Sequence, residues 1–414
     1  MRYFKCLFLA TLFGVGCSAN VVVELIDLPE NVVSVKIDSK LDGVAFLSLE
    51  YSRLERFVLT LPAGDEGVLE VTVQGIGKAG NADCVIATGS GRSEFVRGTQ
   101  YHSTKLTFPV RTIFPTDCRC GSQTYRFKRV DNAATQAAPK QTYRGVFCSS
   151  NQNVTFFGEN RSLLSYTADS GWRYLPGRLG DNHLLDGHGD LGGHIWVANS
   201  NADLYHFDGQ TWGFRSSAAP ARSVWTGGPN NVWAAGGGCK VQRFDGQFWH
   251  IVPTPSDCQG QLERVFGLGD SVWAFGSKTS TAPDGVILKC SSTECVAQIA
   301  ETTETLTSAW GDAVDNFWAV GSRGGLLKYN PNKARWESVQ APQTSGLFDV
   351  WGGNKNNVWA VGDLGTVLRY DGSSWAKYAQ SGVITDQTFM SIWGWGCDLF
   401  LGGQNGTVLQ YTAE

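Results

Sequence analysis

A short pattern centred on tryptophan returns along the carboxy-terminal two thirds of the chain with a period near 40 residues. Its clearest copy reads Asn-Val-Trp-Ala-Val-Gly at 357–362. Aligning the chain on that copy gives anchors at Thr155, Trp196, Trp233, Trp273, Trp318, Trp359 and Phe400. Successive anchors lie 37 to 45 residues apart, which suits a four-stranded unit that must stack on its neighbours to bury both faces.

Two further columns keep the same phase. An aromatic residue follows the anchor by 11 positions in six of the seven repeats, whereas the fourth repeat carries an insertion. A bulky residue precedes the anchor by seven or eight positions, at Phe147, His188, Trp225, Phe266, Trp310, Trp351 and Trp393. The three columns predict an all-β fold with a seven-bladed β-propeller over residues 144–414.

The clearest repeat also predicts the strands of one blade. We expect strands at 347–352, 357–361 and 365–370, with Trp375 opening the fourth strand after a turn at Asp371 and Gly372.

The last repeat ends at Glu414, just after its third strand. Residues 119–143 are therefore interpreted as a linker with a closing strand at 125–130, which completes the last blade and removes an open sheet edge.

Residues 20–118 contain short β-branched segments bounded by glycine, proline, aspartate or asparagine. In one of them Leu69, Val71 and Val73 alternate with polar residues, as in a sheet with one face on a core and the other in water. About seven such segments predict a separate β-sandwich with a general pattern similar to immunoglobulin and fibronectin modules. Its simplest role is a spacer between the propeller and a membrane.

Residues 1–17 are interpreted as a signal peptide, because Arg2 precedes an apolar stretch too short to span a bilayer and small residues follow it. Cys17 after Gly-Val-Gly resembles the lipidated cysteine of a bacterial lipobox, although Gly14 stands where such motifs usually carry leucine. We expect an exported outer-membrane lipoprotein at the cell surface, held to the membrane by this lipid anchor. The alternative is ordinary cleavage and a secreted or periplasmic protein.

Nine cysteines follow Cys17, which in an exported chain favours disulfide bonds and leaves one residue over. The repeats suggest the pairs Cys290–Cys295, Cys239–Cys258 and, between the first and last repeats, Cys148–Cys397. A competing hypothesis makes Cys84, Cys118 and Cys120 a metal site, but the single residue between the last two is not the usual zinc spacing.

One family resemblance rests on three segments of the repeat: Val-Trp-Gly, Asn-Asn-Val-Trp-Ala-Val-Gly and Gly-Thr-Val-Leu-Arg-Tyr-Asp-Gly-Ser-Ser-Trp. They look like the repeats of bacterial surface-lipoprotein propellers and are distantly similar to the Asp-box, or BNR-type, repeats of sialidase-like folds. Tyr370, Phe207 and Phe244 stand where the Asp box carries its aspartate. The resemblance covers about residues 145–414 and implies architecture, because the box is a folding element in that family.

Arg144, Arg222 and Arg264 lie two or three residues before the first-strand aromatic of repeats one, three and four. They are candidates for an anion-binding clamp at the channel mouth, similar to the arginine triad of sialidases. The competing interpretation is that each arginine is a solvated residue at a strand edge.

His183, His188 and His194 are interleaved with aspartates and are candidates for a metal site. His188 occupies the aromatic column and His194 the column of Asn357, so the repeat already accounts for both. We therefore expect no metal.

The net charge of −4 and the charged fraction of 17% give no sign of a basic face, so we expect no nucleic-acid partner. No Ser-His-Asp spacing, glycine-rich phosphate loop or paired acidic motif stands out, so we expect no cofactor and no catalysis. Converging loops at a propeller face favour a scaffold that binds a protein or glycan partner. The alternatives are a structural component of an envelope assembly and a carbohydrate-active enzyme, sialidase-like or polysaccharide-cleaving.

Overall fold

The computed structural model describes residues 19–414 except 27, 53–55, 62–66, 80–81, 96–103, 110, 120–123, 132–134, 137–139, 151–152, 176–178, 180–181, 191, 270, 280–283, 379, 381–383 and 385. The proposed signal peptide and Cys17 therefore lie outside the described residues. The chain divides by its contacts into two units, Met1–Lys78 with Val85–Ile113, and Ala79–Cys84 with Phe114–Glu414. Within the part of the chain described, no helix is long and apolar enough to cross a bilayer.

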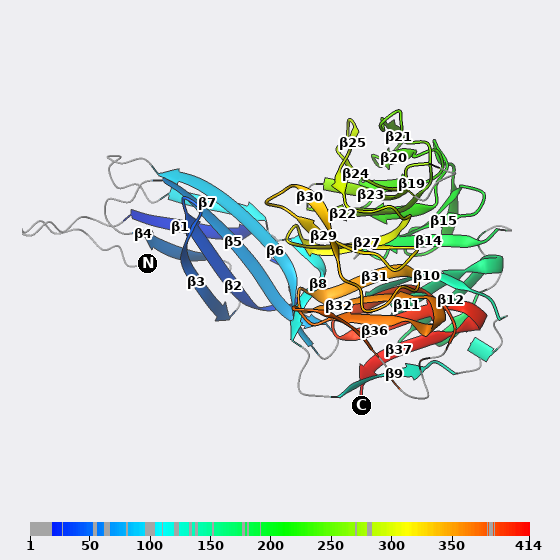
Figure 1. The fold of residues 1–414 in the computed structure, drawn as a ribbon. Coiled ribbons are helices and arrows are strands. Elements are labelled where there is room, and N and C mark those ends of the chain that lie inside the picture. The colour runs from blue at the N-terminus through cyan, green and yellow to red at the C-terminus, as the bar shows by residue number, and fades with distance from the viewer. Residues whose placement is uncertain are drawn as a thin grey trace, which may run out of the picture. The chain divides into compact units, whose positions relative to one another are not determined.

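The amino-terminal part contains two sheets (Figure 1). The first has the order β4-β1-β7, with β1 (Ala19–Ile26), β4 (Arg56–Leu61) and β7 (Thr104–Pro109). The second has the order β3-β2-β5-β6-β8, with β2 (Val32–Leu41), β3 (Val44–Ser52), β5 (Gly67–Ala79), β6 (Ala82–Phe95) and β8 (Arg111–Arg119). Leu69, Val71 and Val73 on β5 are fully buried and alternate with polar residues, so the alternation predicted from the sequence is confirmed.

The remaining described strands form seven further sheets, each containing an antiparallel run of four strands. In chain order, the first three contain β10 (Tyr143–Ser150), β11 (Asn153–Gly158), β12 (Ser162–Thr167), β13 (Gly171–Tyr174); β14 (Leu184–Gly189), β15 (Ile195–Asn199), β16 (Leu204–Phe207), β17 (Trp212–Arg215); and β18 (Ser223–Thr226), β19 (Val232–Ala235), β20 (Val241–Phe244), β21 (Trp249–Val252).

The fourth and fifth sheets contain β22 (Leu262–Leu268), β23 (Ser271–Ser277), β24 (Gly285–Cys290), β25 (Cys295–Ala297); and β27 (Leu306–Ala313), β28 (Asn316–Gly321), β29 (Leu326–Asn330), β30 (Arg335–Val339), with β26 (Ile299–Ala300) added in parallel to β30. The last two contain β31 (Leu347–Asn354), β32 (Asn357–Gly362), β33 (Val367–Tyr370), β34 (Trp375–Lys377); and β35 (Phe389–Trp395), β36 (Asp398–Gly403), β37 (Val408–Ala413), β9 (Tyr125–Arg129). Short 3₁₀ turns η1 (Glu159–Arg161), η2 (Asp363–Gly365) and η3 (Gln404–Gly406) join second and third strands.

The first strand of each of these sheets, called here the inner strand, contacts the inner strand of the next sheet. The same kind of contact joins β35 of the last sheet to β10 of the first, so the series closes on itself. The last sheet is completed by β9, which pairs antiparallel with β37 beside the carboxy terminus (Figure 1). This is the pairing expected for residues 125–130, and it joins the two ends of the ring.

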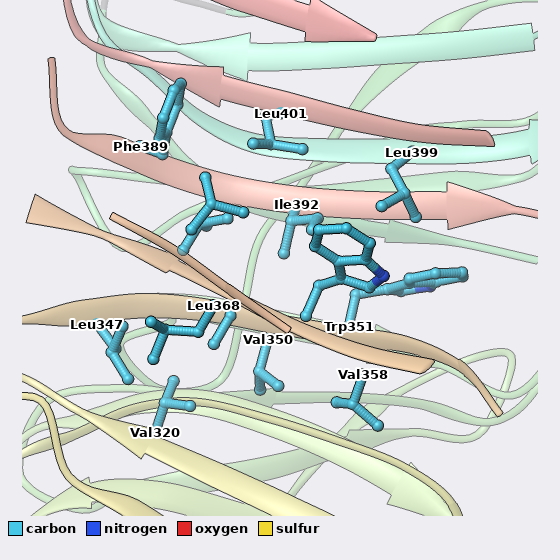
Figure 2. Packing of buried hydrophobic residues seen from close by; sticks show 14 of the residues in the cluster. Val320, Leu347, Val350, Trp351, Val358, Leu368, Phe389, Ile392, Leu399 and Leu401 are labelled. Atoms are coloured by element: carbon cyan, nitrogen blue, oxygen red, sulfur yellow. The ribbon is translucent and has the colours of Figure 1, made fainter. Parts of the chain in front are cut away.

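The recurring tryptophans stack the sheets on one another. Each second-strand anchor is the cross-strand partner of the bulky inner-strand residue, as in the pair Trp351 and Trp359. The asparagine two residues before the anchor accepts a hydrogen bond from the indole, with Asn357 Oδ1 and Trp359 Nε1 2.9 Å apart. Figure 2 shows Trp351 and Val350 of β31 among Ile392 of β35 and Leu399 of β36, in a buried cluster shared by neighbouring sheets.

The glycine after the inner-strand tryptophan has a steric role. A Cβ atom at Gly352 would lie 2.5 Å from the ring of Trp310, and one at Gly394 would meet the ring of Trp351 in the same way. The indole of one sheet thus needs a glycine on the next. This requirement explains why Trp-Gly recurs as a unit in the sequence.

The disulfides correct one prediction. Cys239–Cys258 and Cys290–Cys295 are bonded, so these two predicted pairs are confirmed. The pair Cys148–Cys397 is wrong, because Cys148 carries a free thiol, fully buried in the first sheet, whereas Cys397 is disulfide-bonded. Cys84 and Cys118 also form a disulfide, which argues against the metal-site hypothesis for them.

Candidate functional site

One residue of each inner strand lies two positions before the bulky first-strand residue and forms what we call the polar ring. Its members are Gly145, Asp186, Ser223, Arg264, Ser308, Asp349 and Ser391. The next position along the strands is almost always aliphatic, as at Val224, Val265 and Val350. The charged members therefore lie against an apolar layer, where an unpaired charge is costly.

Arg264 joins two aspartates from sheets on different parts of the ring. Its Nη1 donates to Asp186 Oδ1 at 2.8 Å and its Nη2 to Asp349 Oδ1 at 2.7 Å. The side chains are 20%, 9% and 10% exposed, respectively. A guanidinium has donors enough for both carboxylates at once, and low exposure makes these charge-assisted bonds strong.

Serines and backbone amides satisfy the remaining oxygens. Ser223 Oγ donates to Asp186 at 2.6 Å, and Ser308 Oγ donates to Asp349 at 2.6 Å. The amide of Ile392 on β35 donates to Asp349 Oδ2 at 2.9 Å. The network therefore ties together six inner strands, from β14 to β35.

Burial sets the electrostatics of this network. Burial raises the pKa of Asp349, although Arg264 beside it acts in the opposite direction. Burial disfavours the charged form of Arg264, but Asp186 and Asp349 outweigh that effect and raise its pKa. The guanidinium is therefore held permanently charged at the centre of the ring.

A cavity of about 340 Å³ opens on one side of the network. Its described lining is Arg144, Leu185, Asp186, Arg222, Glu263, Arg264, Thr305, Thr307, Ser322, Phe348 and Met390. A second hollow of about 20 Å³, enough for one water molecule, lies among the first-strand aromatics. Asp186 and Arg264 line both spaces, so this ion pair forms the partition between them.

All three arginines singled out from the sequence line the larger cavity. Each already has a carboxylate partner. Arg144 Nη2 lies 2.6 Å from Glu159 Oε1, and Arg222 Nε lies 2.9 Å from Glu263 Oε2. Arg264 is the floor of the cavity, with both Nη atoms used by the aspartates. The sequence predicted that the three arginines lie together, but it did not predict their carboxylate partners.

The three candidate histidines have separate surroundings. His188 is buried and its Nδ1 accepts a hydrogen bond from the amide of Thr226. His183 is exposed and accepts a bond from the amide of Asn160, whereas His194 lies 3.3 Å from a nitrogen of His206. No group of three or more His, Cys, Asp or Glu side chains within the described ranges is arranged to hold a metal ion.

Comparison with solved structures decides the fold. YCF48 bound to D1 peptide matches over 73% of this chain and 98% of its own, with a TM-score of 0.56 and 16% identity. The virginiamycin B lyase of Staphylococcus aureus matches over 70% and 100%, with a TM-score of 0.59 and 10% identity. The WD40 beta propeller domain of Doa1 matches over 70% and 97%, with a TM-score of 0.54 and 10% identity.

The chain contains a β-propeller. The four-stranded antiparallel sheets match the blades of these propellers, and the polar ring lies on the inner strands of such sheets. No protein-family model matches the sequence, and neither does any curated protein. At these identities the solved propellers establish the fold alone.

Sequence reasoning found Arg264 but missed the two aspartates that hold it. Asp186 is one of the aspartates interleaved with the candidate histidines, and Asp349 belongs to neither candidate site of the sequence analysis. A signal was present, because Asp349 in Leu-Phe-Asp-Val-Trp-Gly is a charge inside an inner strand of the propeller, at the same position as Ser308 and Arg264. A charge at such a position needs a buried partner, which the repeat alignment could have located.

His188 should make the propeller sensitive to acid. Burial, with Arg264 nearby, lowers the pKa of His188 to about 3 from 6.5. As the pH falls, His188 binds a proton in the unfolded chain at a higher pH than in the folded protein. Its contribution to the free energy of unfolding is therefore complete above pH 6.5 and falls as the pH drops towards 3, by up to about 1.4 kcal/mol per pH unit. We expect His188→Phe, which suits the aromatic column, to flatten this slope in urea unfolding between pH 7 and 4.

A matched control for that measurement is His250→Phe, because His250 lies on the surface and pairs with Asp245. A slope that is the same for wild type and His188→Phe would contradict the prediction.

Proposed function

We propose that this chain is a non-catalytic surface scaffold that binds a protein partner in the 340 Å³ cavity of a seven-bladed propeller. The observation that carries the proposal is the chemistry of the cavity. It is lined by apolar, hydroxyl and charged side chains, it is closed below by the Arg264 network, and its described lining contains no histidine, cysteine or tyrosine. Such a pocket suits recognition better than acid–base or nucleophilic chemistry.

The carboxylates of the cavity bear on the enzyme alternative. Asp186 and Glu263 both line it, and a glycoside-cleaving site would need one carboxylate as an acid and a second as a base or nucleophile. Arg264 binds the first and Arg222 the second. Both carboxylates are therefore already engaged by guanidinium groups, whereas a glycoside-cleaving pair would have to reach the glycosidic bond.

The rest of the proposal concerns the setting of the propeller. We assign residues 20–118 to a β-sandwich of immunoglobulin or fibronectin type that acts as a spacer. Lipidation of Cys17 would hold the protein at the outer membrane with the propeller at the cell surface. The apolar segment before Cys17 and the disulfides in the propeller support export. A peptide-bound propeller among the similar structures supports the choice of a protein partner over a glycan.

The experiment is a pull-down from the native envelope with the full mature chain as bait. We expect a stoichiometric protein partner with wild type and about tenfold less of it with Phe348→Glu, which places a charge on the apolar cavity wall. Phe248→Glu is the matched control, because Phe248 is 66% exposed in the turn between β20 and β21. Equal capture by both variants, or capture of glycan without protein, would contradict the proposal.

A further inference from the structure

The wall of the large cavity has an apolar part and a polar part. Residues that immediately precede the polar ring on β31 and β35 are Phe348 and Met390, both partly exposed to the cavity. The same position carries Arg222 just before β18, Glu263 on β22 and Thr307 on β27. Because consecutive inner strands lie side by side, one arc of the wall is apolar and the adjacent arc is polar.

Two nitrogens of Arg222 have no hydrogen-bond acceptor within the part of the chain that the structure describes. Its Nε donates to Glu263 Oε2 at 2.9 Å, and among the described residues no acceptor is hydrogen-bonded to Nη1 or Nη2. The side chain is 42% exposed and lines the cavity, so its two NH₂ groups are accessible from that space. A free pair of guanidinium donors has the spacing that a carboxylate accepts in a bidentate manner.

The three guanidinium groups around the cavity are paired with four carboxylates, Glu159, Asp186, Glu263 and Asp349, so a preference for an anion depends on the unoccupied donors of Arg222 and not on net charge. The described lining contains three guanidinium groups, from Arg144, Arg222 and Arg264, and two carboxylates, from Asp186 and Glu263. Arg144 Nε is buried and has no hydrogen-bond partner among the residues described. In Arg264, each of the three nitrogens already donates a hydrogen bond within the network.

We propose that the cavity binds a carboxylate carried on an apolar body. Arg222 Nη1 and Nη2 donate to the carboxylate, while Phe348 and Met390 pack against the apolar body. This inference rests on the proposed function and names the partner chemistry: an acidic side chain next to an apolar one in a peptide segment. The role of Arg264 is then to support the floor of the cavity, without contact to the ligand.

The test compares two probes of nearly the same shape, one ending in a carboxylate and the other in a neutral amide. Binding of 4-phenylbutyrate and of its neutral amide, 4-phenylbutyramide, is measured on the full mature chain by saturation-transfer NMR titration up to 10 mM. We expect the carboxylate to bind about tenfold more tightly than the amide, as one charge-assisted bidentate contact would give. Equal affinities, or no binding of either probe, would overturn the inference.

Variants locate the contact. Arg222→Gln should abolish the preference for the carboxylate, and Arg222→Lys should keep a smaller preference because it retains the charge without the planar fork. Arg173→Gln is the matched control, since Arg173 is exposed on β13 and makes no ion pair with any residue that the structure describes. Thermal melts of all variants check folding. A preference that survives in a folded Arg222→Gln protein would refute the assignment.

The two proposals fail in different ways. A wild-type protein that prefers the carboxylate but captures no protein from the envelope would leave the site intact and remove the proposed function. A captured protein whose binding is unchanged by Arg222→Gln would leave the function intact and remove the carboxylate site.

Discussion

Deletion of residues 125–129 should destroy the stability of the propeller. This strand, β9, is the fourth strand of the last sheet, and its removal would leave the backbone donors and acceptors of β37 unpaired. It would also remove Phe127, which is 1% exposed and packs against Trp359, Tyr378 and Tyr411. We expect the deletion variant to aggregate on heating well below the wild-type melting temperature.

A single substitution in β9 allows the loss of stability to be measured as a free energy of unfolding. Phe127→Ala should lower the free energy of unfolding by roughly 3–5 kcal/mol, the cost of a large cavity in a packed core. Lys128→Ala is the matched control, because Lys128 is exposed on the same strand. Urea unfolding followed by tryptophan fluorescence measures both. If Phe127→Ala unfolded together with the control, β9 would not be part of the cooperative core.

Replacing Arg264 should lower the free energy of unfolding about as much as Phe127→Ala does, through lost charge pairing and not through a cavity. Arg264→Met would leave Asp186 and Asp349 buried with no cation beside them, and breaking a buried ion pair from one side costs about 3–5 kcal/mol. The measurement is chemical denaturation at pH 7. Arg222→Met is the matched control, since Arg222 is half exposed and its loss leaves only a partly exposed carboxylate.

A second variant separates charge from packing. Adding Asp186→Asn and Asp349→Asn to Arg264→Met removes the uncompensated charges, so we expect the triple variant to regain most of the lost stability. An Arg264→Met protein as stable as wild type would show that water enters the ring and solvates the aspartates.

The repeat pattern contained nearly all the information needed for the blades. Strands expected at 347–352 and 357–361 are found at Leu347–Asn354 and Asn357–Gly362, because the spacing of tryptophan and glycine reflects packing between sheets. The closing strand could also be predicted, since a sheet ending at its third strand needs a partner.

The partners of the site could not be predicted in the same way. Contacts such as Arg264 with Asp349 cross the middle of the ring and join residues 85 positions apart, so no local spacing reveals them. The Cys148–Cys397 pair failed for a related reason. Neighbouring first and last blades bring the two regions together, but the direction of each side chain is set by local packing, and Cys148 is enclosed in a hydrophobic cluster.

The polar ring also has a consequence for how the blades are ordered. Their inner strands are otherwise nearly interchangeable, with the same aliphatic and aromatic positions repeated from blade to blade. The ring distinguishes three of these strands, because the single cation of β22 must face the anions of β14 and β31. In a chain with one blade duplicated or lost, Arg264 would no longer face both aspartates when the ring closed. The network therefore disfavours rings with a different number of blades.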